Sequence, residues 1–428
     1  MKLIRLLCLM LALMTALAGL VSCRRGGDAA MSDTEPFVTA EKSESTATET
    51  ESEAEESFLL NGAPIEEYTV VFPKKVGMMA LGQRVVDAIA EKTGVTLKLE
   101  NDGDTKVDRK EILIGATNRT LPDVTPSYRS GDGYVLGASD GAVFLYGADV
   151  VCTVKAVQAF EEMLFSLQEG ARELLIETKG YASPDTSLAA MSFNVWINQE
   201  TWQKRAPAVA SVIRNVSPDT FGVQEADKKW MDYLSENLPG YAYVGEGRNG
   251  GTSGEYSAVF YRTSVFNLLE SGTKWLSDTP DEVSKYEESS YIRIFTYALL
   301  QRKSDGKKIM HVNTHLDHQS ATARKKQAAV LVEFLKQHKD VPVIVSGDFN
   351  TTQFSSDIAG MFGAGFVTSA EAALCSDGMA ATFSTKVIDF IFVQDGVLDV
   401  YEYRVDKEKP NGIQPSDHNP IYIRYELK

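Results

Sequence analysis

The stretch VPVIVSGDFN, residues 341–350, decides how this chain is interpreted. Its first half is apolar and rich in β-branched residues, which predicts a buried strand over residues 341–346. Gly347 follows, and a glycine lets the chain turn sharply, so that Asp348 and Asn350 can face the same cleft. An Asx turn that closes the strand would explain one of these polar residues, but not the pair together with the glycine. We therefore interpret Asp348 and Asn350 as site residues.

Further polar islands stand at the ends of other apolar runs in the second half of the chain. They are Ser192-Phe193-Asn194 with Gln224-Glu225, Asn313-Thr314-His315, Ser416-Asp417-His418, and Asp389 within the run 387–392. Packing alone does not place acids, amides and histidines at such positions. Hydrolysis of a phosphodiester needs a cation to neutralise the equatorial oxygens, a base for water, and donors for the developing charge. The islands contain side chains of each kind.

Glu225 is the best candidate for a metal ligand, because an acid directly after the apolar run 221–223 is hard to explain by packing. Asn194 offers a neutral oxygen and Asp417 a second charge, and Mg²⁺ prefers carboxylate and carbonyl oxygens together with water. His418 titrates near neutral pH, so we expect it to contact the phosphate and to act as acid or base.

The order and wording of these islands resemble the endonuclease/exonuclease/phosphatase superfamily, in particular its bacterial metal-dependent hydrolase branch. The stretches YVGEGR (243–248), GEYSAVFYR (254–262) and WLSDTP (275–280) are also similar to that branch. The resemblance extends over almost all of residues 187–428. It implies an α/β four-layer sandwich, in which two packed mixed β-sheets are flanked by helices. About ten predicted strands with a few interspersed helices fit that architecture.

The resemblance also implies a role for each candidate. Asn194, Glu225 and Asp417 belong to the metal neighbourhood, Asp389 fixes the tautomer of His418, His315 forms a second histidine centre with Glu255 as its acid, Asp348 orients or deprotonates water, and Asn350 donates to a phosphate oxygen. Arg293 looks like a phosphate-contacting arginine of the family, although a salt-bridged surface arginine is the alternative. Trp196 stands where some relatives have Asp, so we expect one Mg²⁺ (or Mn²⁺) rather than two.

The N-terminus has the pattern of a targeting segment. Lys2 and Arg5 precede an apolar stretch of signal-peptide length, residues 6–20, which ends in LVSC at 20–23. This ending resembles a bacterial lipobox, which implies cleavage before Cys23 and lipid on its sulfur; a plain secretory signal or an anchor helix are the alternatives. We expect a signal peptide over 1–22, a disordered acidic tether over 23–56, and an extracytoplasmic, lipid-anchored protein at the bacterial cell membrane.

Residues 57–183 predict a small α+β accessory domain ahead of a catalytic domain over 184–428. The stretches EILIGATNRT (111–120) and GYVLGASDGAVFLYGAD (133–149) resemble the small domain that precedes the catalytic barrel in glycoside hydrolases such as the β-hexosaminidases. This region carries no cluster of acids or histidines of catalytic character. We interpret it as a spacer, and contact with a glycan stays open.

The formal net charge of the chain is −16, and the negative charge is concentrated near the N-terminus, where residues 24–56 carry 3 basic and 10 acidic side chains. No region is basic, which argues against tight, sequence-blind binding of nucleic acid. We predict a monomeric, divalent-metal-dependent phosphoesterase that cleaves phosphodiester or phosphomonoester bonds at the cell surface. Its substrate class stays open among nucleic acid, phospholipid headgroups and surface polymers. The alternative is an inactive surface lipoprotein that binds a glycan or a host ligand.

Overall fold

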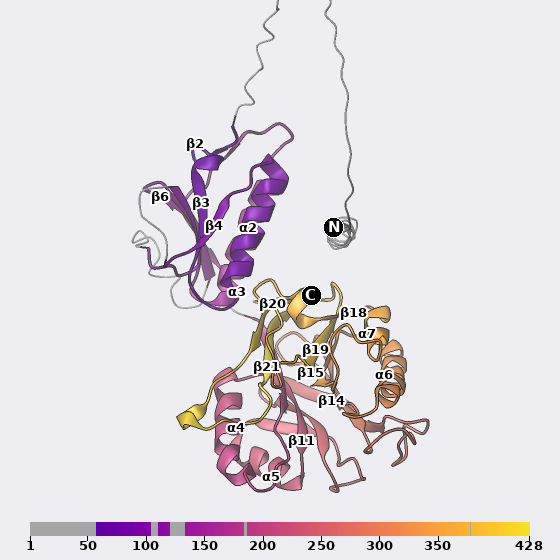
Figure 1. Ribbon diagram of the computed structural model, residues 1–428. Helices are drawn as coiled ribbons and strands as arrows, with labels where there is room; N and C mark the ends of the chain where they lie inside the picture. Colours follow the sequence, from indigo (N-terminus) through magenta and orange to yellow (C-terminus); the bar gives the residue numbers. More distant parts are fainter. Residues whose placement is uncertain (1–56, 104–109, 120–132, 184–185, 377) are drawn as a thin grey trace, which may run out of the picture. The chain divides into compact units, whose positions relative to one another are not determined.

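The computed structural model describes residues 57–103, 110–119, 133–183, 186–376 and 378–428 (Figure 1). The predicted signal peptide, the lipidation site Cys23 and the acidic tether lie outside these described residues. Among the helices of the described part, none combines the length and apolar character needed to cross a bilayer.

The region before residue 183 is built on a six-stranded sheet in the order β4-β3-β5-β7-β6-β9. Its elements are β3 (Tyr68–Phe72), α2 (Met78–Thr93), β4 (Lys98–Asn101), β5 (Lys110–Ile114), β6 (Gly133–Ser139), β7 (Ala142–Gly147), α3 (Val150–Ser166) and β9 (Lys179–Ala182). A small second sheet consists of β1 (Leu59–Leu60), β2 (Ala63–Pro64) and β8 (Glu173–Leu174), and the 3₁₀ turn η1 (Ile65–Glu67) follows β2. Strands β6 and β7 form an antiparallel hairpin. Helix α3 begins at Val150, where the Asp149 carboxylate caps it by accepting the Cys152 N–H at 2.7 Å.

The apolar core of this region extends into the C-terminal part of the chain. Cys375 and Tyr401 belong to the same buried cluster as the side chains of α2 and α3. The Lys155 ammonium also lies 3.2 Å from the Glu426 carboxylate. Residues 56–428 accordingly form one compact unit. The domain boundary at 183/184 stays a prediction, and packed side chains cross it.

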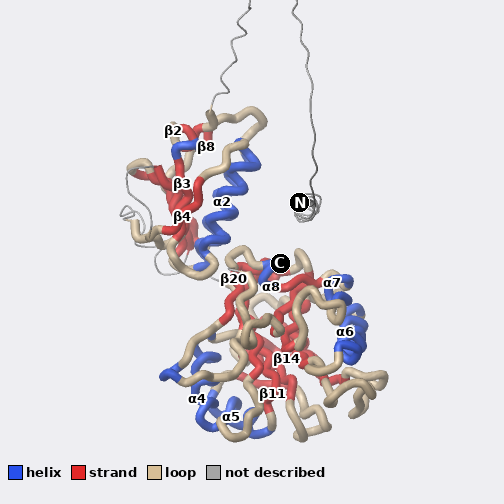
Figure 2. Tube along the Cα trace, viewed as in Figure 1, coloured by secondary structure: helices blue, strands red, loops and turns tan. Residues whose placement is uncertain are grey.

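The C-terminal region consists of two six-stranded sheets with helices on their outer faces (Figure 2). The first sheet runs β12-β13-β11-β10-β21-β20, with β10 (Leu188–Asn194), β11 (Thr220–Ala226), β12 (Tyr241–Val244), β13 (Tyr256–Arg262), β20 (Leu398–Val405) and β21 (Ile421–Leu427). The second runs β14-β15-β16-β17-β19-β18, with β14 (Phe266–Trp275), β15 (Ile294–Arg302), β16 (Lys308–His315), β17 (Val343–Asp348), β18 (Phe366–Thr368) and β19 (Asp389–Gln394).

The helices divide between the two outer faces. Helices α4 (Trp202–Val216) and α5 (Lys228–Asn237) pack on the first sheet, and α6 (Ala321–Lys336) and the short α7 (Ala359–Gly363) pack on the second. The short α8 (Ser369–Ala372) and the 3₁₀ turn η3 (Pro410–Gly412) lie in connections. A third apolar cluster lies between the sheets, so the predicted four-layer sandwich is confirmed.

A buried polar layer separates that apolar cluster from the strand ends. The Gln224 amide donates to Asn313 Oδ1 at 2.6 Å, and Asn313 donates in turn to the Val223 and Ala258 carbonyls at 2.9 Å. His311 bridges the sheets through Thr220 Oγ1 at 2.9 Å and Ser346 Oγ at 2.8 Å. These bonds hold the two sheets at a defined separation directly behind the polar islands.

Strand pairing explains why the islands meet. The parallel pair β10–β11 places Asn194 beside Gln224, and the parallel pair β16–β17 places His315 beside Asp348. The antiparallel pair β17–β19 then sets Asp348 opposite Asp389. Because parallel strands end at the same edge of a sheet, side chains far apart in the sequence converge there.

Candidate active site

The polar islands line one cavity of about 360 Å³ at the ends of the central strands. It is lined by Trp196, Ile197, Glu225, Arg248, Glu255, Tyr291, Arg293, His315, His318, Asp348, Asn350, Phe383, Ile388, Asp417 and His418. Eight of the expected site residues are in this set, and the other two, Asn194 and Asp389, contact it from behind.

Three residues of this set offer metal-ligating atoms close together. One atom each of Glu225, Asp348 and His418 lies within 4.8 Å of the others. Asn194 contacts this group as a hydrogen-bond donor, since its Nδ2 donates to Glu225 Oε1 at 3.0 Å and to Asp348 Oδ2 at 3.1 Å. Its Oδ1, the neutral oxygen expected as a ligand, instead accepts the Trp196 N–H at 3.0 Å. Asp417 lines the same cavity but lies outside this close group, so the expected ligand set of Asn194, Glu225 and Asp417 is only partly drawn together.

The backbone at the site takes conformations that side chains rarely adopt. Glu225, Asn350 and Trp196 have φ angles of 60°, 52° and 58°. The pairing of β11 with β13 also shifts register between Val223 and Ala226. A bulge of this kind re-aims the side chain that follows it. Strained backbone of this type clusters at functional sites, where the surrounding structure holds it in place.

Gly347 is required by a close approach of two strands. A Cβ at this position would lie 2.3 Å from the Thr314 carbonyl oxygen on the neighbouring strand β16. The expected sharp turn at this glycine is wrong, because Gly347 lies inside β17 and is paired with Thr314 and Phe390. The glycine also lets β17 remain paired up to Asp348, whose side chain then reaches the cavity.

His418 and Asp389 form a buried pair. His418 Nδ1 lies 2.9 Å from Asp389 Oδ2, as expected for a carboxylate that fixes the histidine tautomer. Burial lowers the pKa of His418, but the charge and hydrogen bond of Asp389 outweigh it and raise the pKa to about 10. In this arrangement His418 carries a proton at neutral pH and can donate it from Nε2.

Asp348 lies between the two histidines. Its Oδ2 is 3.5 Å from His315 Nε2 and 3.8 Å from His418 Nε2, and its Oδ1 accepts the Asn350 N–H at 2.8 Å. Burial, followed by the charge of Asp389, raises the pKa of Asp348 to about 7. A carboxylate with such a pKa is suited to exchange a proton with water near neutral pH.

His315 and Asn350 contact each other. Asn350 Nδ2 donates to His315 Nε2 at 3.0 Å and to the Leu316 carbonyl at 3.1 Å. Burial, with the nearby charge of Arg293, lowers the pKa of His315 well below its usual value, so the ring is neutral. Asn350 thus orients His315, and its expected donation to a phosphate oxygen stays a prediction.

Glu255 is not the partner of His315. Its Oε1 lies 2.8 Å from Arg248 Nη2, and its Oε2 lies 3.9 Å from Arg293 Nη1, whereas no hydrogen bond or ion pair joins it to His315 among the described residues. The reason is geometric, since Glu255 precedes β13 in the first sheet and His315 ends β16 in the second. The surface-arginine alternative for Arg293 does not hold either, because its side chain is only 5% exposed.

Arg205 ties the loops of the site together and had no signal beyond its place in a predicted amphipathic helix. Its Nη1 donates to the Val195 and Pro415 carbonyls at 2.8 Å, and its Nη2 donates to the Trp196 carbonyl at 2.7 Å. These carbonyls follow Asn194 in one loop and precede Asp417 in the other. An arginine on the apolar face of a predicted amphipathic helix is an unusual pattern, and it would have indicated a buried structural role for Arg205.

The aromatic residues at the rim of the cavity were also not predicted from the sequence. Tyr291 stacks on His318 with ring centroids 5.6 Å apart, and Phe383 lies 4.7 Å from the His418 ring. Trp196, noted only as a departure from the relatives' Asp, lies under the Arg205 guanidinium at 4.7 Å. Such residues lie in loops, and hydrophobic periodicity does not predict which loop residues reach a cavity.

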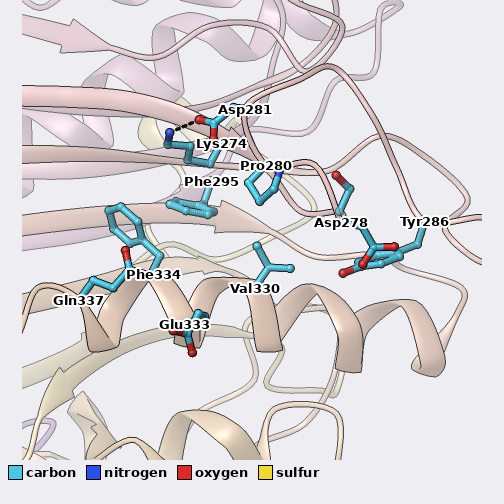
Figure 3. A pocket seen from close by; sticks show the side chains of 11 residues that line it. Lys274, Asp278, Pro280, Asp281, Tyr286, Phe295, Val330, Glu333, Phe334 and Gln337 are labelled. Atoms are coloured by element: carbon cyan, nitrogen blue, oxygen red, sulfur yellow. Dashed lines mark hydrogen bonds and ion pairs between the residues drawn. The ribbon is translucent and has the colours of Figure 1, made fainter.

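A second cavity, of about 430 Å³, lies between α6 and the loop after β14 (Figure 3). Its lining includes the rings of Phe295 and Phe334 and the ion pair of Lys274 with Asp281. None of the expected site residues lines it. We therefore place the chemistry in the first cavity.

The donor set of the first cavity fits a divalent cation. Glu225, Asp348 and Asp417 line the cavity with three carboxyl groups, and Asp389 lies behind them, bound to His418. Burial raises the pKa of Asp417, and the negative charge of Glu225 raises it further. Hard oxygen ligands in this number suit Mg²⁺ or Mn²⁺, and a cation would relieve their mutual repulsion.

Comparison with known proteins agrees with this geometry. Residues 191–418 match the Endonuclease/Exonuclease/phosphatase family. An endonuclease/exonuclease/phosphatase family protein from Bacteroides thetaiotaomicron is 31% identical, and the match covers 57% of this chain and 98% of that one with a TM-score of 0.53. A mannosyl-6-phosphatase from the same species is also 31% identical, over 56% of this chain and 100% of that one, with a TM-score of 0.53.

A family protein from Bacteroides vulgatus is 30% identical, over 57% of this chain and all of that one, with a TM-score of 0.53. A comparison with curated protein sequences found no match. The family match covers more than half of the chain and includes every island of the site. The chain therefore belongs to the endonuclease/exonuclease/phosphatase family.

Proposed function

We propose that this protein hydrolyses phosphate esters with the help of one divalent cation, Mg²⁺ or Mn²⁺. The observation that carries the proposal is the convergence of Glu225, Asp348 and His418 within 4.8 Å in a cavity that also contains arginines. Glu225 and Asp417 would hold the cation, and the Asn194 amide would orient the Glu225 carboxylate. When bound, such a cation supplies charge neutralisation for the phosphoryl oxygens.

The chain's own residues account for the proton transfers. Asp348 is placed to accept a proton from the attacking water, because its carboxylate is buried between two imidazoles. His418, held by Asp389, donates from Nε2 to an oxygen of the phosphate. Neutral His315, oriented by Asn350, lies 3.5 Å from the Asp348 carboxylate and lines the cavity beside it. The mannosyl-6-phosphatase relative supports a phosphoesterase.

The test is hydrolysis of p-nitrophenyl phosphate and bis-p-nitrophenyl phosphate by the purified protein, with Mg²⁺, Mn²⁺ or EDTA. We expect metal-dependent turnover that falls by about 10³-fold or more in Glu225→Gln and in His418→Ala. Glu236→Gln, at an exposed acid on α5, is the matched control and should retain full activity. Turnover that survives EDTA and both variants would contradict the proposal.

Absence of turnover with any metal on these esters, a nucleic acid and a sphingomyelin would favour the alternative of a surface protein that binds a glycan or a host ligand. Binding of labelled glycans to the full chain, with Glu225→Gln unchanged, would then support that alternative.

We also propose that the protein is a monomer held at the outer face of a bacterial membrane by lipid on Cys23. The support is the sequence alone, in which an apolar segment ends in LVSC. One acyl chain binds a membrane only marginally, so a stable anchor needs more than one. Partition into detergent should be lost in Cys23→Ser but retained in Cys8→Ser, and equal partition of both would overturn the anchor.

A further inference from the structure

Two arginines and one carboxylate occupy the part of the active-site cavity formed by the loops before β13 and β15. Arg248, Glu255 and Arg293 all line the cavity, and their side chains are 15%, 14% and 5% exposed. Glu255 lies between the two guanidinium groups, at 2.8 Å from Arg248 and 3.9 Å from Arg293. One carboxylate cannot neutralise two guanidinium groups, so this group keeps one positive charge.

Arg293 is incompletely satisfied. Its Nε is buried without a hydrogen-bond partner in the described part of the chain, and the 3.9 Å contact to Glu255 is too long for a hydrogen bond. A buried donor that lacks an acceptor costs roughly 1–3 kcal/mol. A guanidinium kept in this condition inside a cavity indicates that its acceptor is an anionic ligand.

Arg248 is held rigidly beside it. The backbone N–H of Arg248 donates to the Glu255 carbonyl at 2.9 Å, and its carbonyl accepts from Trp275 Nε1 at 2.7 Å. The guanidinium also lies over the Tyr291 ring, 4.8 Å from the centroid. A planar group fixed in this way can bind two phosphate oxygens at little cost in entropy.

We propose that Arg248 and Arg293, aligned by Glu255, form a clamp for a terminal phosphate, so that the enzyme prefers dianionic phosphomonoesters to phosphodiesters. The clamp rests on the proposed function, because it acts on the ester whose phosphorus lies near Asp348 and His418. A monoester carries about two negative charges at neutral pH and has three terminal oxygens. A diester carries one charge and has two such oxygens, which leaves the second arginine without a partner.

The experiment compares kcat/KM for p-nitrophenyl phosphate and bis-p-nitrophenyl phosphate in the full chain with Mg²⁺. We expect the wild type to prefer the monoester. In Arg248→Met, kcat/KM for the monoester should fall about 10–100-fold, the value of a lost charge-assisted hydrogen bond, while the diester changes less than about threefold. Arg248→Lys should recover part of the monoester activity.

Arg302→Met is the matched control, because Arg302 is a similarly buried, acid-paired arginine at the far end of β15. It should leave the ratio of the two esters unchanged. A wild type that prefers the diester, or equal losses on both esters in Arg248→Met, would overturn the clamp while leaving the phosphoesterase intact.

If the wild type cleaves neither ester, the proposed function fails, and the clamp is tested by calorimetric titration with inorganic phosphate in the presence of Mg²⁺. Binding about tenfold weaker in Arg248→Met than in Arg302→Met would support the clamp. Equal binding in the two variants would overturn it.

Discussion

The sheet of residues 68–182 and the sandwich of residues 188–427 differ in what they place behind their strand ends. Helices α2 and α3 close the first sheet with a continuous apolar cluster that includes Leu81, Val157 and Phe160. Between the sheets of the sandwich, apolar packing gives way to a polar layer around Asn313 and His311, and the layer leads to the charged cavity.

The difference shows how a fold can reserve part of its interior for chemistry. A buried polar layer contributes less to stability than an apolar one, but when every member is satisfied it fixes positions more narrowly. We therefore expect substitutions in the first sheet to lower stability more than activity, and substitutions in the polar layer of the sandwich to lower activity more than stability. The following substitutions test this contrast.

The largest effect is expected from Asp389→Asn. The amide keeps the size of the side chain but removes the charge that holds His418 protonated and oriented, so kcat should fall by about 10³–10⁴-fold. The measurement is steady-state kinetics beside thermal unfolding. Asp399→Asn, at a partly exposed acid on β20, is the control, and a fall of less than tenfold in Asp389→Asn would contradict the role given to the pair.

Phe160→Ala tests the other side of the contrast. Phe160 is buried in the cluster under α3, so its removal should lower the free energy of unfolding by about 3–5 kcal/mol. At a temperature where the variant is still folded, kcat should stay within about twofold of the wild type. Urea unfolding and the ester assay measure the two quantities, and a large loss of kcat in folded protein would mean that the two regions are coupled.

Gly147→Ala and Gly222→Ala form a matched pair between the two regions. A Cβ at Gly147 would lie 2.2 Å from the Thr153 backbone nitrogen, and a Cβ at Gly222 would lie 2.4 Å from the Asn313 and Ser346 side chains. Each should cost about 1–3 kcal/mol of stability through overpacking. Only Gly222→Ala should also lower kcat, because it displaces the polar layer. Equal kcat values in the two variants would show that the layer does not position the site.

The smallest effect concerns the pH dependence of stability through His311. Burial lowers the pKa of His311 to about 3, below the value near 6.5 expected in the unfolded chain. Between these values the unfolded state binds more protons, so acidification destabilises the fold, by about 1.4 kcal/mol at pH 5.5 for this group. His311→Gln removes this contribution. Its stability should fall less than that of the wild type between pH 7 and pH 5.5, and parallel curves would argue against a buried neutral His311.

Much of the sandwich could be predicted from hydrophobic periodicity. Strands β10, β13, β15, β16, β17, β19 and β21 and helices α4 and α6 appear within a few residues of their expected positions. The strands β12, β14, β18 and β20 were not expected; all four lie at the edges of the two sheets, and their sequences lack a long continuous apolar run. In β14, for example, most of the ten residues are exposed or half-buried.

The residue types of the site could be predicted as well, since Asp348 and Glu225 follow apolar runs, and His418 precedes one, where packing gives no reason for them. Their partners were less predictable. Asp389 lies beside His418 as expected, but Glu255 pairs with Arg248 rather than with His315. Which acid reaches which base depends on the side chains between the strands, and no spacing along the chain encodes it.

Local chemistry along the chain therefore determined the layers, the family and the kinds of group available for catalysis. Strand periodicity and an acid at a strand end are properties of short segments, so they are readable from order alone. The tertiary structure decided the charge balance of the cavity: one carboxylate between Arg248 and Arg293, and three potential ligands within 4.8 Å. These facts depend on distances between segments that the sequence separates by tens to hundreds of residues, and only the pairing of the strands brings those segments together.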